Sequence, residues 1–169
     1  NEQTIKDIDY NTSLKETLPM WNEQLLKYGT ELIIMRSEFI KELNPLIAEI
    51  HAGLSGGKET LSIAYEPNVS PENFREQLAK NQFQEIRQRQ TLTGPHRDDL
   101  NFIVNGTDIR RFGSQGQQRT AALSLKLAEI ELVKKIVKDY PVLLLDDVLS
   151  ELDSKRQDII FQKLPTFRP

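Results

Sequence analysis

The stretch GSQGQQRTAALSLKLAEIELVKKIVKDYPVLLLDDVLSELD, residues 113–153, decides the fold of this chain. Ser114 and Gln117 have the S-x-x-Q spacing of a capping box, which predicts a helix over about 116–138. The buried stripe expected on that helix consists of Ala121, Leu125, Ala128, Leu132 and Ile136. The continuous apolar run 142–145 is typical of a strand covered on both faces. A helix followed by a buried strand predicts an α/β arrangement for this part of the chain.

Three aspartates follow the apolar strand. Asp146 and Asp147 stand at its carboxyl end, and Asp153 comes seven residues after Asp146. Ligands gather at this end of the strands in open α/β sheets, so these acids suit a phosphate-bound Mg²⁺. The alternative is a strand that runs into an acidic turn, and the third acid shifts the balance toward the magnesium interpretation.

A small polar loop precedes the predicted helix. Residues 113–119 read Gly-Ser-Gln-Gly-Gln-Gln-Arg. A helix N-terminus presents unpaired N–H groups and a partial positive charge, and Gly116 lets a phosphate approach the backbone closely. The loop therefore suits an anion; the alternative is that Ser114 only caps its helix.

A long helix is predicted upstream, from about Leu18 to Ala52, with Thr17 as its cap. Pro45 is expected to bend or divide this helix near Glu42, because proline removes a hydrogen bond and its ring clashes with the preceding turn. Apolar residues recur in steps of three and four and predict one stripe facing a partner helix. The residues of that stripe are Trp21, Leu25, Tyr28, Leu32, Met35, Phe39, Leu43, Leu46 and Ile50.

Shorter elements lie between the two long helices. Residues 60–65 alternate like a strand, and Ser70 followed by Pro71 opens a helix that reaches about Arg89. This pattern predicts a helical lobe with a small strand over residues 1–90.

The residue pattern of the sequence changes at about Gln90, from helical spacing to short strand-like segments. Strand-like segments around Leu92 and 102–104 flank the turn-rich residues 94–99, and Asn105-Gly106 is a strong hairpin signal. The predicted fold class is therefore α+β or mixed α/β, with a second domain over residues 91–169.

Composition narrows the class of protein. The chain has 169 residues, 38% of them hydrophobic and 28% charged, which is enough to bury a core in one domain or two small ones. Its net charge of −3 is not a strongly basic nucleic-acid footprint. The absence of cysteine excludes disulfides, thiolate zinc sites and thiol nucleophiles. No apolar run approaches the roughly 20 residues of a membrane span, so we expect a soluble, cytoplasmic chain without a membrane partner.

Together, the loop and the acids resemble the C-terminal half of an ATPase head of the ABC type, in the SMC and RecF group. Residues 114–117 resemble the signature motif, with Gln115 in place of its usual first glycine, and 142–147 resemble Walker B. Residues 150–153, which include Ser150 and Asp153, resemble the D-loop. The block 93–100 matches the RecF branch in order and spacing, and the resemblance extends over nearly the whole chain.

The resemblance implies a composite nucleotide site with Mg²⁺ and ATP as cofactors. Asp146 would hold Mg²⁺ through water, and Asp147 would orient or deprotonate the attacking water, where the wider family more often has Glu. Ser114, Gly116 and Gln117 would contact the γ-phosphate of ATP bound to the opposite subunit, and Gln115 belongs to the same motif. Asp153 and Ser150 of the D-loop would lie at the dimer seam.

The function implied is that of an ATP-dependent DNA-binding clamp in recombinational repair and replication restart. Such a protein forms a homodimer on ATP and helps load recombinase at gapped or single-stranded DNA, together with recombination mediator proteins. One alternative is an SMC-like ATPase head with a role in chromosome structure. Another is a helical protein-interaction module without ATPase activity, which binds its partner through the 21–50 stripe.

A phosphate-binding loop of the Walker A type, G-x-x-x-x-G-K-[ST], does not occur in the sequence. Residues 53–59 have the wrong spacing and place Glu59 where a hydroxyl is needed, so they predict a tight turn between helix and strand. We therefore expect this chain to be a fragment that is inactive alone, derived from an intact ABC-type ATPase.

Histidines and arginines complete the list of candidates. His96 lies in a Gly-Pro turn, where a structural role is favoured over catalysis, and His51 is expected to be a solvated side chain near a helix end. Arg110, Arg111 and Arg119 flank the signature-like loop, where they would meet DNA or phosphate or else remain solvated. No DNA-contacting residue is assigned.

Overall fold

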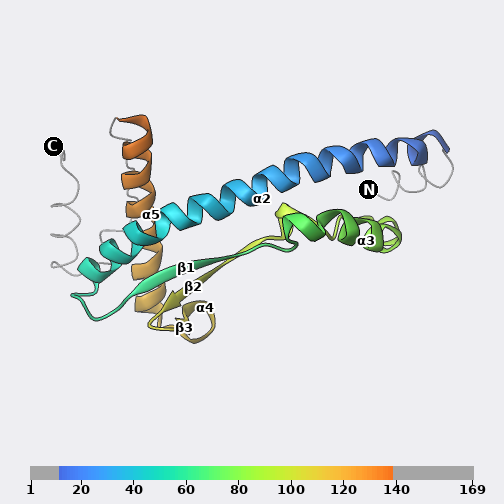
Figure 1. Ribbon diagram of the computed structural model, residues 1–169. Helices are drawn as coiled ribbons and strands as arrows, with labels where there is room; N and C mark the ends of the chain where they lie inside the picture. Colours follow the sequence, from blue (N-terminus) through green and yellow to red (C-terminus); the bar gives the residue numbers. More distant parts are fainter. Residues whose placement is uncertain (1–11, 139–169) are drawn as a thin grey trace, which may run out of the picture. The chain divides into compact units, whose positions relative to one another are not determined.

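The computed structural model describes residues 12–138, which Figure 1 draws in colour. In chain order the elements are α2 (Thr12–Leu54), β1 (Leu61–Glu66), η1 (Pro71–Asn73), α3 (Phe74–Gln88), η2 (Pro95–Arg97), β2 (Asp99–Val104), β3 (Thr107–Asp108), α4 (Ile109–Phe112) and α5 (Gln115–Val137). The strands form one small sheet in the order β1-β2-β3. Helices with a small sheet confirm the predicted mixed fold class. The strand predicted at 142–145 lies outside the described residues.

Contacts divide the chain into two compact units, which we describe separately. Within the described residues, the first unit joins 12–40 with Tyr65–Leu100, and the second joins Lys41–Ala64 with 101–138. Within residues 12–138, none of the helices is both long and apolar enough to cross a membrane.

The core of the first unit forms between α2 and α3. Its buried residues are Leu26, Ile33, Val69, Phe74 and Leu78, with Leu25 and Tyr65 packed against them. Pro71 opens the short η1 helix, and α3 ends where Arg89 adopts a left-handed conformation, which confirms the predicted second helix. Leu26 and Ile33 are seven residues apart, so both lie on one face of α2.

This face of α2 differs from the predicted stripe. Residues at seven-residue intervals are buried along the whole helix: Leu26, Ile33, Ile40, Ile47 and Leu54. In the predicted stripe, Trp21, Tyr28 and Met35 are 57%, 59% and 64% exposed. Over 21–39 the prediction is therefore wrong except at Leu25, which is half-buried against the core. Leu43 and Ile50 of that stripe are buried as predicted. Two apolar rows run along α2. The row with Leu26 and Ile33 lies in the core around Phe74, and Leu25 of the predicted row packs against that core.

The start of α2 also differs from the prediction. The helix is already formed at Thr12, so Thr17 and Leu18 lie inside it rather than at its beginning. Propensity signals place helix ends only to within a few residues, because tertiary contacts decide how far a helix extends.

Pro45 does not divide the helix; of the two outcomes expected near Glu42, a bend or a division, the division is wrong. Its missing N–H weakens one turn. The adjacent Asn44 anchors that turn to β1: its amide donates to the Ile63 carbonyl at 2.9 Å, and its Oδ1 accepts from the Ile63 N–H at 2.8 Å. These two bonds hold the helix on the strand through the weakened turn.

A glycine-rich turn ends α2. Gly56 and Gly57 have φ values of 65° and 78°. The Gly57 N–H donates to the Ala52 carbonyl at 2.7 Å, and the Gly56 N–H donates to the Gly53 carbonyl at 3.2 Å. This bond pattern is a Schellman motif. The predicted tight turn between helix and strand is therefore confirmed.

Strands β2 and β3 form the antiparallel hairpin expected at Asn105-Gly106 (Figure 1). Val104 pairs with Thr107, and both turn residues have positive φ, 49° and 82°, as a type I′ turn requires. The side chain and backbone of Asn105 also bond to the segment before β1: Asn105 Oδ1 accepts from the Thr60 N–H at 2.9 Å.

No strand forms around Leu92, where one was predicted. The Leu92 and Thr93 N–H groups instead donate to the Glu85 carboxylate at 2.7 and 3.0 Å. A side chain of α3 thus supplies the acceptors that a neighbouring strand would otherwise provide.

Helix α5 confirms the predicted helix at 116–138 to within one residue at each end. Ala121, Ala128 and Leu132 of its predicted stripe are buried, Leu125 is half-buried, and Ile136 is exposed. The stripe is thus correct except in the last turns of the helix.

Candidate functional site

The signature-like loop is held in shape by the capping box predicted from its spacing. Ser114 Oγ accepts from the Gln117 N–H at 3.2 Å, and Gln117 Oε1 accepts from the Ser114 N–H at 2.9 Å. Gly113 leads into the cap, and a Cβ built there would lie 2.5 Å from the Ile109 carbonyl oxygen. Glycine is therefore required at 113, because the turn from α4 passes too close for a side chain.

Gly116 has a different status, although it lies in the same loop. Ser114, Gln115 and Gly116 are exposed, and Gln117 is half-buried. A Cβ built at Gly116 would meet only Ser114 Oγ, at 3.9 Å. Glycine in a helix costs about 1 kcal/mol relative to alanine, and packing gives no reason for it here. An open glycine at a helix start leaves room for a ligand to approach the backbone.

The electrostatics of the loop suit an anion. Helix geometry gives the first-turn N–H groups of Gln115 and Gly116 no intrahelical acceptor, and the dipole of the 23-residue α5 adds a partial positive charge. Three exposed arginines lie near in sequence: Arg110, Arg111 and Arg119. Arg111 Nε lies 3.5 Å from Asp108 Oδ2, and this ion pair is weak because both groups meet solvent.

The side chain of Gln117 connects the loop to a buried histidine. Gln117 Nε2 donates to Glu59 Oε1 at 2.9 Å, and Glu59 Oε2 lies 3.2 Å from His51 Nε2. His51 has no solvent exposure, so the prediction of a solvated side chain is wrong. Sequence reasoning missed both residues. The one available signal was a histidine on the apolar row of α2, between Ile47 and Leu54.

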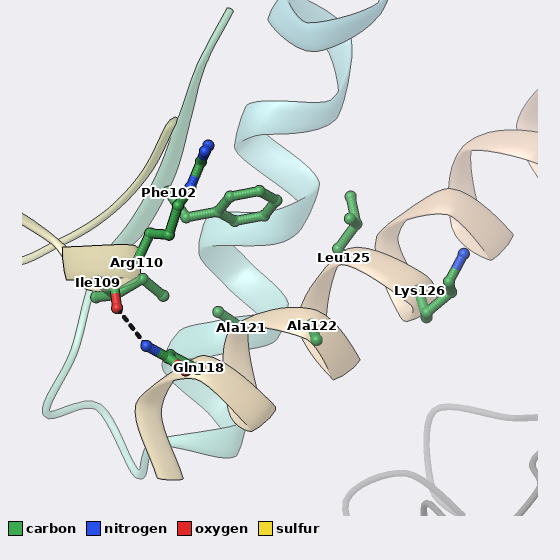
Figure 2. A pocket seen from close by; sticks show the side chains of 8 residues that line it. All are labelled: Phe102, Ile109, Arg110, Gln118, Ala121, Ala122, Leu125 and Lys126. Carbon is green, nitrogen blue, oxygen red and sulfur yellow. Dashed lines mark hydrogen bonds between the residues drawn. The ribbon is translucent and has the colours of Figure 1, made fainter. Parts of the chain in front are cut away.

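A hollow of about 410 Å³ lies beside the start of α5 (Figure 2). Phe102, Ile109, Ala121 and Leu125 line it, with Arg110 and Lys126 among its polar groups. Gln118 Nε2 donates to the Ile109 carbonyl at 2.8 Å, which joins α5 to α4 at this place (Figure 2). The lining is mostly apolar, so its chemistry differs from that of the polar loop before it.

The turn at residues 94–99 has a structural role. The ring Nε2 of His96 lies 2.9 Å from the carbonyl oxygen of Thr91, which precedes this turn. The Gly94 N–H donates to Asn68 Oδ1 at 3.1 Å. These bonds support the structural interpretation of His96 that the sequence favoured.

The acidic half of the expected site lies outside the described residues. Asp146, Asp147, Ser150 and Asp153 all fall after residue 138. Within residues 12–138, no group of three or more histidine or acidic side chains is arranged to hold a metal ion. The structure therefore describes the signature-like loop of the expected site and not the acids expected to hold Mg²⁺.

The relatives that sequence comparison finds for this chain share one protein name. No family model matches the sequence. The chain is 54% identical to the DNA replication and repair protein RecF of Lachnoclostridium phytofermentans over 160 residues, which are 95% of this chain and 44% of that protein. It is 52% identical to the protein of the same name from Agathobacter rectalis over the same shares. The chain thus spans less than half the length of the curated relatives it matches.

Solved structures give the same result for the fold. The chain matches the recombination mediator protein RecF-ATPrS of the RecFOR pathway with a TM-score of 0.82 and 34% identity, over 95% of this chain and 46% of that one. It matches RecF-ATP of the same pathway with a TM-score of 0.78 and 36% identity, over 90% and 43%.

Proposed function

This chain matches a segment of RecF in both sequence and fold, and we propose that it is part of an ATP-dependent DNA-binding clamp of recombinational repair and replication restart. In this proposal two copies pair on ATP and help load recombinase at gapped or single-stranded DNA. Recombination mediator proteins are the expected partners, because the solved relatives are described as members of the RecFOR pathway.

The geometry of the Ser114 loop is the observation that carries the proposal. An exposed, capped helix start with an open glycine can donate several hydrogen bonds to one phosphate. Such donors act where charge accumulates in phosphoryl transfer. We assign the direct phosphate contacts to Ser114 and Gly116. The side-chain hydrogen of Gln117 that is not donated to Glu59 would lie beside them, and Gln115 would lie at the edge of the phosphate site.

The acids complete the proposed site from the facing subunit. Asp146 has the oxygen chemistry that Mg²⁺ requires and would hold it through water. Asp147 would orient or deprotonate the attacking water, and its short side chain is expected to slow hydrolysis. Ser150 and Asp153 would lie at the seam. ATP then joins the two copies, since its phosphates are fully bonded only in the closed pair.

One observation favours a second candidate, a helical module that binds a protein partner. Trp21, Tyr28 and Met35 expose a row of large apolar side chains on α2. Exposed apolar rows of this kind mark interaction surfaces. Identity to RecF favours the clamp, and it also favours RecF over an SMC-like head.

Ser114→Arg tests the clamp directly, in a full-length RecF protein that carries this segment. The bulky side chain is expected to block the loop, which in this proposal contacts only the nucleotide of the facing subunit. We expect at least a tenfold loss of ATP-induced dimer, on the order of the effect of a misplaced contact at a preorganised site. ATP binding by the monomer should stay unchanged. Sedimentation with and without ATP measures the dimer, and a fluorescent nucleotide measures binding.

Ser62→Arg is the matched control, because Ser62 is an exposed serine on β1. It should pair on ATP like the wild type. Normal pairing of the Ser114→Arg protein would remove the loop from the nucleotide site and the clamp proposal with it.

A further inference from the structure

A closed chain of hydrogen bonds lies behind the Ser114 loop. It begins at Gln117 in the first turn of α5 and passes to Glu59, whose other carboxylate oxygen lies 3.2 Å from His51 Nε2. His51 Nδ1 lies 3.0 Å from Ser124 Oγ, which returns the chain to α5. Ser124 Oγ in turn donates to the Thr120 carbonyl at 2.7 Å. Two points of α5 are thus tied to one imidazole ring.

Hydrogen bonds from other residues hold the backbone at Glu59 and on both sides of it. Its N–H donates to Ser55 Oγ at 3.2 Å. Asn105 bonds to both neighbouring residues: its Nδ2 donates to the Lys58 carbonyl at 3.3 Å, and its Oδ1 accepts from the Thr60 N–H at 2.9 Å. The carboxylate that meets Gln117 therefore stands on a backbone held by Ser55 and by the β2–β3 hairpin.

The histidine occupies a position where packing alone would favour an apolar residue. His51 is fully buried on the same side of α2 as Ile47, Ile50 and Leu54. A buried imidazole is tolerated only when its nitrogens are bonded. Here those bonds lead to Glu59, and through Glu59 to the residue whose side chain completes the Ser114 capping box.

We propose that His51 and Glu59 are positioning residues for the signature-like loop. They hold the Gln117 amide so that its oxygen keeps the Ser114 N–H, which fixes the Ser114 hydroxyl and the first-turn N–H groups in the orientation that meets the γ-phosphate of the facing subunit. Neither residue touches the nucleotide. This inference rests on the proposed function, because the phosphate is the ligand that the loop is held for.

Two substitutions of His51 test this proposal, because each replaces a different one of the two hydrogen bonds that the imidazole ring makes. His51→Gln places an amide donor where Nε2 meets Glu59, whereas His51→Asn reaches only toward Ser124. In a full-length RecF protein carrying this segment, we expect His51→Asn to weaken ATP-induced dimerisation about tenfold or more. His51→Gln should restore it to within about threefold, and both variants should bind ATP as monomers like the wild type. Glu59→Ala should behave like His51→Asn, since it removes the oxygen that accepts from Gln117 Nε2.

The outcomes separate this inference from the clamp proposal. If both His51 variants pair normally, or if both lose pairing equally together with thermal stability, the network is only structural and the inference is overturned. If the wild type fails to pair on ATP, or Ser114→Arg pairs normally, the clamp proposal itself fails. A loss in Ser114→Arg and in His51→Asn, with rescue in His51→Gln, supports both.

The Gln117 side-chain amide gives a readout that does not depend on function. In ¹⁵N–¹H spectra of this chain, its resonances should stay near their wild-type positions in His51→Gln and should move in His51→Asn and Glu59→Ala. Unmoved resonances in all three variants would contradict the proposal that His51 and Glu59 position the Gln117 side-chain amide.

Discussion

At the residue scale, Asp98 of the block 93–100 is the centre of a hydrogen-bonded cluster. Its carboxylate accepts from Arg36 Nη1 at 2.8 Å, from the Tyr65 hydroxyl, and from the Asn68 N–H at 2.9 Å. The Asp98 side chain is only 4% exposed, and Arg36 also donates to the Pro95 carbonyl. A buried carboxylate is stable only when several donors surround it, so these residues form one unit.

Tyr65 turns this cluster into a prediction about pH. Burial, and then the hydrogen bond and charge of Asp98, raise the pKa of the Tyr65 phenol from 10.0 to about 12. The unfolded chain therefore loses this proton at lower pH than the folded chain. The stability that the phenol contributes is complete below about pH 10 and is lost as the pH rises through about 12.

The measurement is the free energy of unfolding of the wild type and of Tyr65→Phe between pH 8 and 12.5. The phenylalanine variant lacks the titrating group, and all other groups are common to both proteins. The wild type should be the more stable protein at pH 8, and the difference should shrink above about pH 10. A constant difference across this range would rule out the raised pKa.

At the element scale, the two glycines Gly29 and Gly53 of helix α2 lie in different packing environments. A Cβ built at Gly29 would lie 2.6 Å from Cε1 of Phe74 and 3.3 Å from Pro95 Cδ, whereas a Cβ at Gly53 would meet nothing within 4 Å. Phe74 is fully buried, so its ring cannot move aside. Gly29 is thus required by the close approach of α3, and Gly53 is not required by packing.

Gly29→Ala and Gly53→Ala are accordingly expected to have opposite effects. Overpacking against Phe74 should make Gly29→Ala less stable by about 1–3 kcal/mol, in spite of the better helix propensity of alanine. Gly53→Ala should gain about 0.5–1 kcal/mol, because alanine restricts the unfolded chain and fits the helix. Urea unfolding of this chain measures both values. Stabilisation by both substitutions would show that α3 does not approach α2 so closely.

At the scale of the whole molecule, the proposed function gives this chain only half of a nucleotide site. The Ser114 loop is a set of donors on the surface, and the sequence contains no G-x-x-x-x-G-K-[ST] loop to cradle the phosphates from the other side. A helix start alone holds an anion weakly, since solvent and salt screen it.

We therefore expect micromolar ATP with Mg²⁺ to leave the melting temperature of this 169-residue chain unchanged. A ligand stabilises a fold only in proportion to its occupancy of the folded state. A full-length RecF protein is the positive control and should melt at a higher temperature with ATP. A rise that depends on ATP concentration in the chain alone would mean that it holds a complete site of its own.

The sequence by itself determined the elements whose causes are local. The capping box at Ser114, the hairpin at Asn105-Gly106 and the turn at Gly56-Gly57 each follow from a few adjacent residues, because a cap or a positive φ is satisfied within one turn of chain. The resemblance to the family motifs is readable in the sequence for the same reason, since each motif is a short run at fixed spacing.

Only the tertiary structure decided which apolar row of α2 is buried and what surrounds His51. The row with Trp21 and the row with Leu26 both repeat at helical spacing, so periodicity cannot choose between them; the choice depends on where Phe74 packs. His51 meets Glu59 eight residues away and Ser124 seventy-three residues away. A contact at such separation leaves no local pattern in the sequence, because it exists only once the chain is folded.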